Sequence, residues 1–201
     1  MGHRRSVMSI VLPLLVFLFP LAYSPGPGNM TFAANGARFG FAATLPANLG
    51  YHIATLCVAL AMGFGALSLL NAVPWLFTAL KIAGALYVLW LAIGFLRAEL
   101  SEDARRPRPI SFADGVVLLV LNPKAYLIMA LMFSQFLNGE DLTTVVVIAT
   151  VFTLNNLLAF CVWTLAGDVL LRAFRSPGAA RRMNTGFGVA LALTAVWMLL
   201  A

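Results

Sequence analysis

One lysine of this chain lies where a charged side chain is expected to have a specific role. Lys124 stands near the centre of the apolar segment 112–137, about 12 residues or roughly 18 Å from either end at 1.5 Å per helical residue. An ammonium at the centre of a bilayer costs about 2.5–3.5 kcal/mol on insertion scales, so it should face a cavity or a partner. Lys124 can bind a carboxylate or release its proton during a functional cycle. Alternatively, it is a structural cation that pairs with free backbone carbonyls.

Lys124 belongs to one of two proline-containing sequences that interrupt apolar segments. Asn122-Pro123-Lys124 is the second, and Pro25-Gly26-Pro27, with Asn29 two residues further on, is the first. Proline lacks an N–H donor and clashes with the preceding helical turn, and hydrocarbon cannot replace the lost hydrogen bonds. Each break therefore leaves free carbonyls on one side and a helix N-terminus with a partial positive charge on the other.

Two such breaks facing each other near the membrane midplane can hold a small zwitterion. A carboxylate suits the positive helix end, and an ammonium suits the free carbonyls. The alternative is that each proline only kinks its helix, but the matched pair favours a binding site. The predicted binding residues at the breaks are Pro25, Gly26, Pro27, Asn29, Asn122, Pro123 and Lys124.

Three more polar residues lie inside apolar segments. Asn155 and Asn156 stand in the middle of the segment 143–167, where an amide needs a hydrogen-bond partner on another helix. They either bond helices together or line the substrate path. His52 is either a packing residue with its hydrogen bonds satisfied or a carrier of protons, because histidine has the unperturbed pKa nearest neutrality.

The composition predicts that the surrounding elements are membrane helices. Of the 201 residues, 62% are hydrophobic and 10% are charged, against about 45–50% apolar and about 25% charged in ordinary globular domains. A helical span needs about 20 apolar residues. We expect an all-α fold, a polytopic membrane bundle of six hydrophobic helices, with residues 1–201 as a single integral membrane domain. The apolar segments are about 7–23, 39–69, 75–96, 112–137, 143–167 and 183–200.

The two halves of the chain are predicted to be repeats. The proline breaks are 98 residues apart, and the apolar segments that follow them have offsets near a hundred. Repeat one covers about 7–97 and repeat two about 112–200. Because three spans are an odd number, the second repeat enters the membrane from the opposite face, which gives two inverted three-helix repeats with Pro-broken first helices, an arrangement common in secondary transporters.

The distribution of positive charge predicts the orientation in the membrane. The net charge is +6, but the basic residues lie in short membrane loops rather than on a soluble face, so nucleic acid is not the expected partner. Nine arginines lie on one predicted side of the membrane, against Arg4 and Arg5 on the other. By the positive-inside rule, the side with nine arginines is cytoplasmic, and both termini are outside. If the first segment turns back within the membrane, only the C-terminus is outside.

Gly36 and Gly40 have the GxxxG spacing that allows close helix packing. We expect this spacing to serve packing within one chain, and the alternative is a contact between two chains in a homodimer.

The interrupted segments resemble a known family. "SPGPGNMTFAANGARFGF" is similar to the PGP segment of the LysE/RhtB family of amino-acid exporters, and "FADGVVLLVLNPKAYLIMALMFSQF" resembles its second signature around NPKA. The resemblance implies six hydrophobic helices and export of amino acids or close derivatives across the cell inner membrane, coupled to protons, by alternating access between the two halves. It implies no cofactor. Because no carboxylate lies near the middle of any segment, neutral small amino acids are favoured as substrates.

The sequence departs from the family at one position. Many members have a Gly-Asp pair in the second helix, whereas this chain has Gly50 followed by Tyr51 and His52. If that aspartate carries a proton in relatives, His52 is the candidate here, together with Lys124.

Two other classes of protein fit the sequence less well. An intramembrane enzyme needs a serine with a histidine partner, or histidines and carboxylates at metal-ligand spacing, and neither pattern is visible. No metal site is expected. A structural membrane subunit would not require matched breaks with a central lysine.

Overall fold

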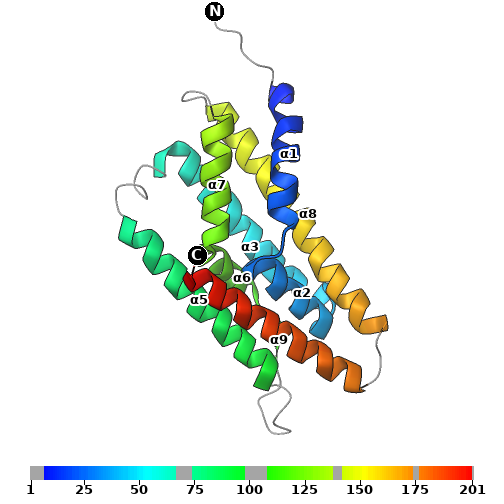
Figure 1. Ribbon diagram of the computed structural model, residues 1–201. Coiled ribbons are helices and arrows are strands. Elements are labelled where there is room, and N and C mark those ends of the chain that lie inside the picture. The colour runs from blue at the N-terminus through cyan, green and yellow to red at the C-terminus, as the bar shows by residue number, and fades with distance from the viewer. Residues whose placement is uncertain (1–6, 67–73, 98–107, 138–141, 174–176, 201) are drawn as a thin grey trace, which may run out of the picture.

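The computed structural model describes residues 7–66, 74–97, 108–137, 142–173 and 177–200, and in these residues every regular element is a helix (Figure 1). The all-α prediction is thus confirmed. The elements are α1 (Val7–Tyr23), α2 (Pro27–Phe39), α3 (Phe41–Ala61), the π-helical turn η1 (Met62–Ala66), α5 (Pro74–Arg97), α6 (Phe112–Val120), α7 (Pro123–Phe136), α8 (Leu142–Ala173) and α9 (Pro177–Leu200).

Both proline sequences break a helix, as predicted. α1 and α2 form one bent pair with an angle of 62°, and α6 and α7 form another with an angle of 61°. At each break a proline opens the next helix at a position where its missing N–H is not needed, Pro27 in α2 and Pro123 in α7. The two halves of the chain therefore begin with bent helices of almost equal angle.

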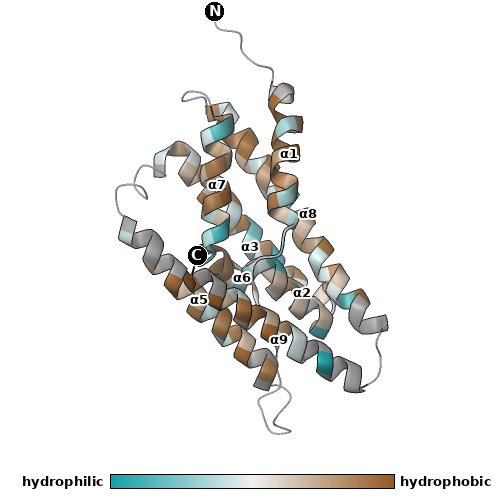
Figure 2. Cartoon of the chain, viewed as in Figure 1, coloured by the Kyte–Doolittle hydropathy of each residue, from teal (hydrophilic) through white to brown (hydrophobic). Residues whose placement is uncertain are grey.

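The described helices are long and apolar enough for a multi-pass membrane protein. Phe41–Gly65 and Leu142–Val169 each qualify as a span, and the two bent pairs qualify if each is counted as one span. The described parts of α5 and α9 contain shorter apolar helices, Ile82–Ile93 and Thr185–Val196. Large apolar side chains such as those of Leu86, Trp90 and Leu154 are exposed. Apolar residues predominate along most of the described helices (Figure 2), and exposed apolar side chains are what a lipid-facing surface requires.

The predicted segment 39–69 is divided near its start. Gly40 has φ 85° and ends α2, so α3 begins only at Phe41. The carboxylate of Asp168 on α8 accepts a hydrogen bond of 3.2 Å from the N–H of Phe41, and a negative charge is favourable at a helix N-terminus. The expectation that Gly40 packs helices together was therefore wrong, because Gly40 makes the turn between α2 and α3.

Two helix pairs approach each other closely at reciprocal glycines. On α2 and α8, a Cβ added to Gly36 would collide with the carbonyl of Thr164, and one added to Gly167 would collide with that of Ala33. α3 and α6 repeat this pattern with the pairs Gly50–Phe112 and Gly115–Ala47. Gly36 thus packs within one chain, so the predicted GxxxG spacing gives no argument for a homodimer. Both contacts join the first half of the chain to the second.

The start of the second half of the chain is bonded to the first half. Asn35 on α2 is 1% exposed. Its amide nitrogen donates to the hydroxyl of Thr44, and its carbonyl accepts from the N–H of Ile110. The chain that enters α6 is thereby fixed against the turn between α2 and α3, and α5 and α9 pack side by side against this assembly (Figure 1).

Candidate functional site

Lys124 joins the two breaks. Its ammonium Nζ lies 2.8 Å from the carbonyl oxygen of Ser24, 2.9 Å from the hydroxyl oxygen of Ser24 and 3.4 Å from the carbonyl oxygen of Pro25. Three N–H donors thus meet three acceptors. Gly26 permits this approach, because a Cβ there would lie 2.8 Å from Lys124 Cδ. The structural alternative for this lysine, pairing with free carbonyls, is the arrangement observed. We call these three contacts the inter-break hydrogen bonds.

The other carbonyls at the end of α1 also have side-chain partners. The last carbonyls of a helix have no partner within the helix, and here the carbonyls of Leu21, Ala22 and Tyr23 are each bonded by a side chain from another part of the chain or from the break itself. Asn29 Nδ2 donates to Ala22 O at 2.9 Å, Trp163 Nε1 to Tyr23 O at 3.2 Å, and Ser24 Oγ to Leu21 O at 3.0 Å.

The second break is organised by Asn122. Its side-chain oxygen accepts from the N–H of Lys124 at 3.1 Å and so caps α7, and its amide nitrogen donates to the hydroxyl of Tyr51 at 2.8 Å. Asn122 and Tyr51 are 5% and 1% exposed, so this bond lies in the core. Tyr126 donates to the carbonyl of Val120 at the end of α6.

The N-terminus of α2, unlike the carbonyls at the end of α1, has no side-chain hydrogen bond from its N-cap residue. Gly26 is its N-cap residue and provides no side-chain hydrogen bond, and Pro27 follows it. α7, in comparison, is capped by Asn122. The positive end of α2 therefore lies at the break without a side-chain cap from its N-cap residue, next to Lys124.

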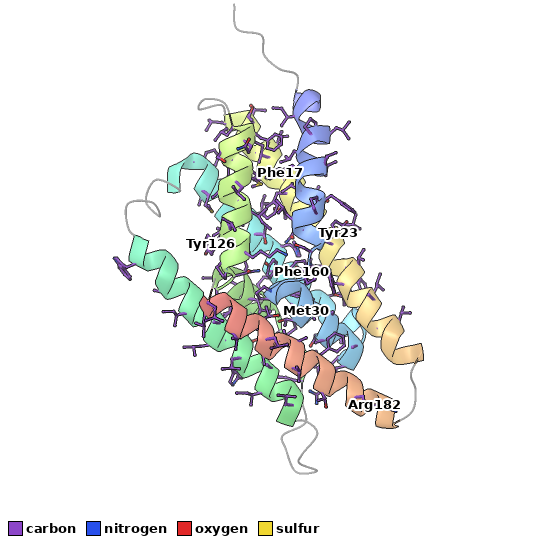
Figure 3. The ribbon with its side chains drawn as sticks, in the orientation of Figure 1. Phe17, Tyr23, Met30, Tyr126, Phe160 and Arg182 are labelled. Atoms are coloured by element: carbon purple, nitrogen blue, oxygen red, sulfur yellow. The ribbon has the colours of Figure 1, made fainter. Side chains whose placement is uncertain are left out.

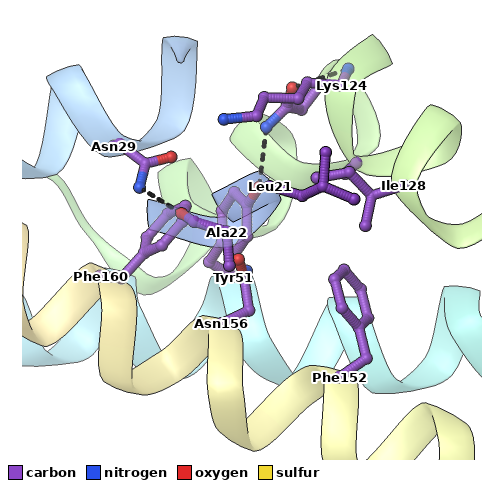
Figure 4. A pocket seen from close by; sticks show the side chains of 11 residues that line it. Leu21, Ala22, Asn29, Tyr51, Lys124, Ile128, Phe152, Asn156 and Phe160 are labelled. Atoms are coloured by element: carbon purple, nitrogen blue, oxygen red, sulfur yellow. Dashed lines mark hydrogen bonds between the residues drawn. The ribbon is translucent and has the colours of Figure 1, made fainter. Parts of the chain in front are cut away.

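A small cavity lies against the inter-break hydrogen bonds (Figure 4). It has about 10 Å³ of free volume, which is about enough for one water molecule. Its apolar wall includes Phe152, Phe160 and Ile128. Its polar lining consists of Asn29, Tyr51, Asn122, Lys124 and Asn156. An amino acid has several times more heavy atoms than a water molecule, so this conformation is too closed to hold one.

His52 lies beside this cavity in a neutral hydrogen-bonding arrangement. Its Nδ1 is 2.8 Å from the carbonyl oxygen of Asn48, which only accepts, so Nδ1 must carry the proton. Nε2 is then the acceptor for the amide nitrogen of Asn156 at 3.3 Å. A second proton on Nε2 would face an N–H donor, so protonation of His52 requires the Asn156 amide to turn over.

The two adjacent asparagines of α8 have different surroundings. Asn156 is 6% exposed and lines the cavity, whereas Asn155 is outside the cavity lining and its buried amide nitrogen has no hydrogen-bond partner in the described part of the chain. The structure thus brings together Pro25, Gly26, Asn122, Lys124 and their neighbours at the breaks, with Asn156 nearby, and leaves Asn155 apart.

Three residues at this site were not singled out from the sequence. Phe160 lies at the centre of the bundle (Figure 3), with ring centroids 4.5 Å from Tyr51 and 4.9 Å from Phe32. Ser24 supplies two of the acceptors for Lys124, and Trp163 on α8 donates to the carbonyl of Tyr23 at the first break. Only Ser24 had a signal in the sequence, its position directly before Pro25.

Comparison with known proteins decides the family. Residues 19–201 match the LysE type translocators over both breaks and all the helices that follow. The chain belongs to the LysE type translocator family. It is 28% identical over 177 residues, 87% of this chain, to proteins named cysteine/O-acetylserine efflux protein from Salmonella typhimurium (strain LT2) and Escherichia coli (strain K12), and the match covers 90% of each. No solved structure matches.

Membership of the LysE type translocators identifies the class of function. The resemblance seen at the PGP and NPKA segments is confirmed, and the chain is a membrane translocator rather than an enzyme. In this LysE type chain the two signature segments are the two breaks, and Lys124 of the second bonds Ser24 and Pro25 of the first.

Proposed function

We propose that this protein is a secondary transporter that exports small neutral amino acids or close derivatives across the bacterial inner membrane. The observation that carries the proposal is the meeting of the two helix breaks through Lys124 beside a polar-lined cavity. The names of the relatives support this class of substrate, since they are efflux proteins for cysteine and O-acetylserine.

The two breaks offer complementary groups to a zwitterion. The uncapped N-terminus of α2 and the ammonium of Lys124 suit the substrate carboxylate. The carbonyls of Ser24 and Pro25 suit an ammonium. Asn29 and Asn156 use their amide nitrogens in the hydrogen bonds described above, which leaves their carbonyl oxygens for the substrate.

Alternating access fits the arrangement of the repeats. Each repeat supplies one break, and the cavity between them is closed to a single water-sized space. A substrate can enter only if helices on one side separate, and the inverted repeats would open the opposite side by the equivalent movement.

Proton coupling has two candidate residues, His52 and Lys124. His52 can take up a proton only if Asn156 turns its amide oxygen toward Nε2. Because Asn156 lines the cavity, protonation of His52 would change the groups presented to the substrate. A His52→Gln variant would test this role, since it should export amino acids without responding to a proton gradient.

The proposal is tested by an export assay. Cells or vesicles containing the protein are loaded with a panel of amino acids that includes cysteine, O-acetylserine, neutral amino acids, lysine and arginine, and their release is measured. We expect faster release of at least one small neutral member. Unchanged release across the whole panel, with the protein present in the membrane, would contradict export.

A further inference from the structure

The inter-break hydrogen bonds hold the same chemical group that an amino-acid substrate carries. Ser24 O, Ser24 Oγ and Pro25 O are three acceptors around one primary ammonium, at 2.8, 2.9 and 3.4 Å. A primary ammonium has three N–H donors, so Lys124 saturates the set. No carboxylate among the described residues forms an ion pair with Lys124, so the lysine is held there by neutral oxygens alone.

These hydrogen bonds also connect two particular helices. Lys124 is in the first turn of α7, and Ser24 directly follows α1. α1 and α7 lie on the same side of the breaks (Figure 1). The two helices also touch through the rings of Phe17 and Phe136, which pack edge to face with centroids 5.5 Å apart.

The other helix pairs that join the repeats are packed differently. α2 with α8 and α3 with α6 meet at glycines whose added Cβ would collide with backbone carbonyls of the partner helix. Backbones in such close contact cannot slide or tilt without losing many contacts at once. α1 and α7 are joined by side chains, and each is attached to its neighbouring helix by a proline break. α1 also packs against α8, so the contact that can open without disturbing a close backbone approach is the one between α1 and α7.

We propose that the primary ammonium of the substrate replaces the ammonium of Lys124 on Ser24 and Pro25, and that this exchange separates α1 from α7. The inference rests on the proposed function and adds how substrate binding opens one side of the protein. Lys124, once released, pairs with the carboxylate of the same substrate molecule.

The balance of charge makes the exchange specific for zwitterions. A second ammonium entering without a carboxylate would leave two positive charges together in a medium of low dielectric, which is unfavourable. A molecule that has a carboxylate but no ammonium can pair with Lys124, but it cannot replace the lysine in its hydrogen bonds to the three acceptors. An N-methylated amino acid has one N–H donor fewer than the site accepts. Only a molecule with a primary ammonium and a carboxylate completes the exchange.

The test measures the proximity of α1 and α7 by cross-linking. Phe17→Cys and Phe136→Cys are introduced into the full chain lacking the two free cysteines, Cys57 and Cys161. The protein is reconstituted in lipid vesicles and treated with a short bifunctional thiol reagent. The probes are O-acetyl-L-serine, its N-methyl derivative, O-acetylethanolamine without the carboxylate and 3-acetoxypropionate without the ammonium.

We expect O-acetyl-L-serine to slow cross-linking by about tenfold, the effect of exchanging one hydrogen bond to a charged group, and the three analogues to change it less than about twofold. Equal effects of O-acetyl-L-serine and O-acetylethanolamine would overturn the requirement for a zwitterion. No effect of O-acetyl-L-serine on cross-linking, in protein that exports it, would overturn the exchange itself.

Two variants separate the exchange from a general loosening of the protein. Ser24→Ala removes one of the three acceptors and should slow cross-linking before any probe is added. Ser134→Ala on α7 is the matched control, because that exposed hydroxyl bonds only to Leu131 O in its own helix, and it should cross-link like the parent. Equal cross-linking in Ser24→Ala and Ser134→Ala would contradict the proposal.

The failures of the two proposals are distinguishable. If export is absent for every amino acid while O-acetyl-L-serine still slows cross-linking, the protein binds amino acids but the proposed export is wrong. If export is present and cross-linking does not respond, the exchange is wrong and the transport function stands.

Discussion

At the scale of single residues, the sequence predicts two alternative roles for Lys124, a structural one and one in substrate binding. The structure shows the lysine paired with the carbonyls of Ser24 and Pro25, which is the structural role. Its position beside the cavity and the uncapped end of α2 supports the binding role in the proposed transport cycle.

Replacing Lys124 with Met should abolish most transport without reducing the amount of protein in the membrane. The charge is lost while length and apolar packing are kept, and the cost of inserting an ammonium, about 2.5–3.5 kcal/mol, disappears. Export should fall by more than about tenfold. Lys124→Arg keeps the charge but not the release of a proton, so partial activity points to binding and no activity to proton handling.

Lys81→Met in α5 is the control for this experiment, because Lys81 belongs to neither break. It should export at nearly the parental rate. If Lys124→Met also exports normally over a range of substrate concentrations, the lysine is structural only.

Gly26→Ala should impair transport while leaving the fold intact. The added methyl group would lie 2.8 Å from Cδ and 3.0 Å from Nζ of Lys124, and the flexible lysine can move away, so the cost falls on the inter-break hydrogen bonds. Gly186→Ala is the control, because nothing lies within 4 Å of its added Cβ. Equal rates of export for the two variants would argue against a role for the lysine position.

At the scale of helices, the reciprocal glycine contacts should matter for stability more than for the site. Gly115→Ala and Gly167→Ala each place a methyl group against a backbone carbonyl of the partner helix, and a backbone atom cannot move away as a side chain can. Overpacking of this kind costs about 1–3 kcal/mol. Thermal unfolding of the purified protein should show a lower Tm for both.

Gly186→Ala again serves for comparison and should leave the Tm equal or higher, because alanine favours the helix by about 1 kcal/mol over glycine. A Tm for Gly167→Ala as high as that of Gly186→Ala would show that the α2–α8 contact is looser than described.

The helices show which features a sequence can predict. The breaks at Pro25 and Pro123 were predictable because proline acts on its own helix. The division of the segment 39–69 at Gly40 was not predictable, because Gly40 follows Gly36 at a spacing that also suits helix packing. The feature that indicates a turn instead is the hydrogen bond from Phe41 to Asp168, a residue far along the chain. In the same way Trp163, the partner of the Tyr23 carbonyl, and Tyr51, the partner of the Asn122 side chain, come from contacts that no local pattern records.

At the scale of the whole molecule, the orientation in the membrane is the main expectation that stays a prediction. Reporters fused after Arg106 and after Ala179 should read cytoplasmic, and one at Ala201 should read external. The reason is the excess of nine arginines over two. Arg106 and Ala201 lie outside the described residues, so the fusions test what the sequence alone predicts. A cytoplasmic C-terminus would contradict both the orientation and the inverted repeats.

The inter-break hydrogen bonds have a consequence for how the protein is made. Ser24 and Lys124 are 100 residues apart, and at about 5–20 residues per second a ribosome needs roughly 5–20 s to make that length. Until then the carbonyls of Ser24 and Pro25 lack their hydrogen-bond donor, the ammonium of Lys124. The carbonyl of Tyr23 lacks its donor for longer, because Trp163 is made later. The first helix therefore cannot settle in the hydrocarbon with its break bonded until Lys124 and Trp163 have both been made. A nascent chain arrested before Lys124 leaves the ribosome should stay next to the insertion machinery, and one arrested after Trp163 has emerged should be free to leave it.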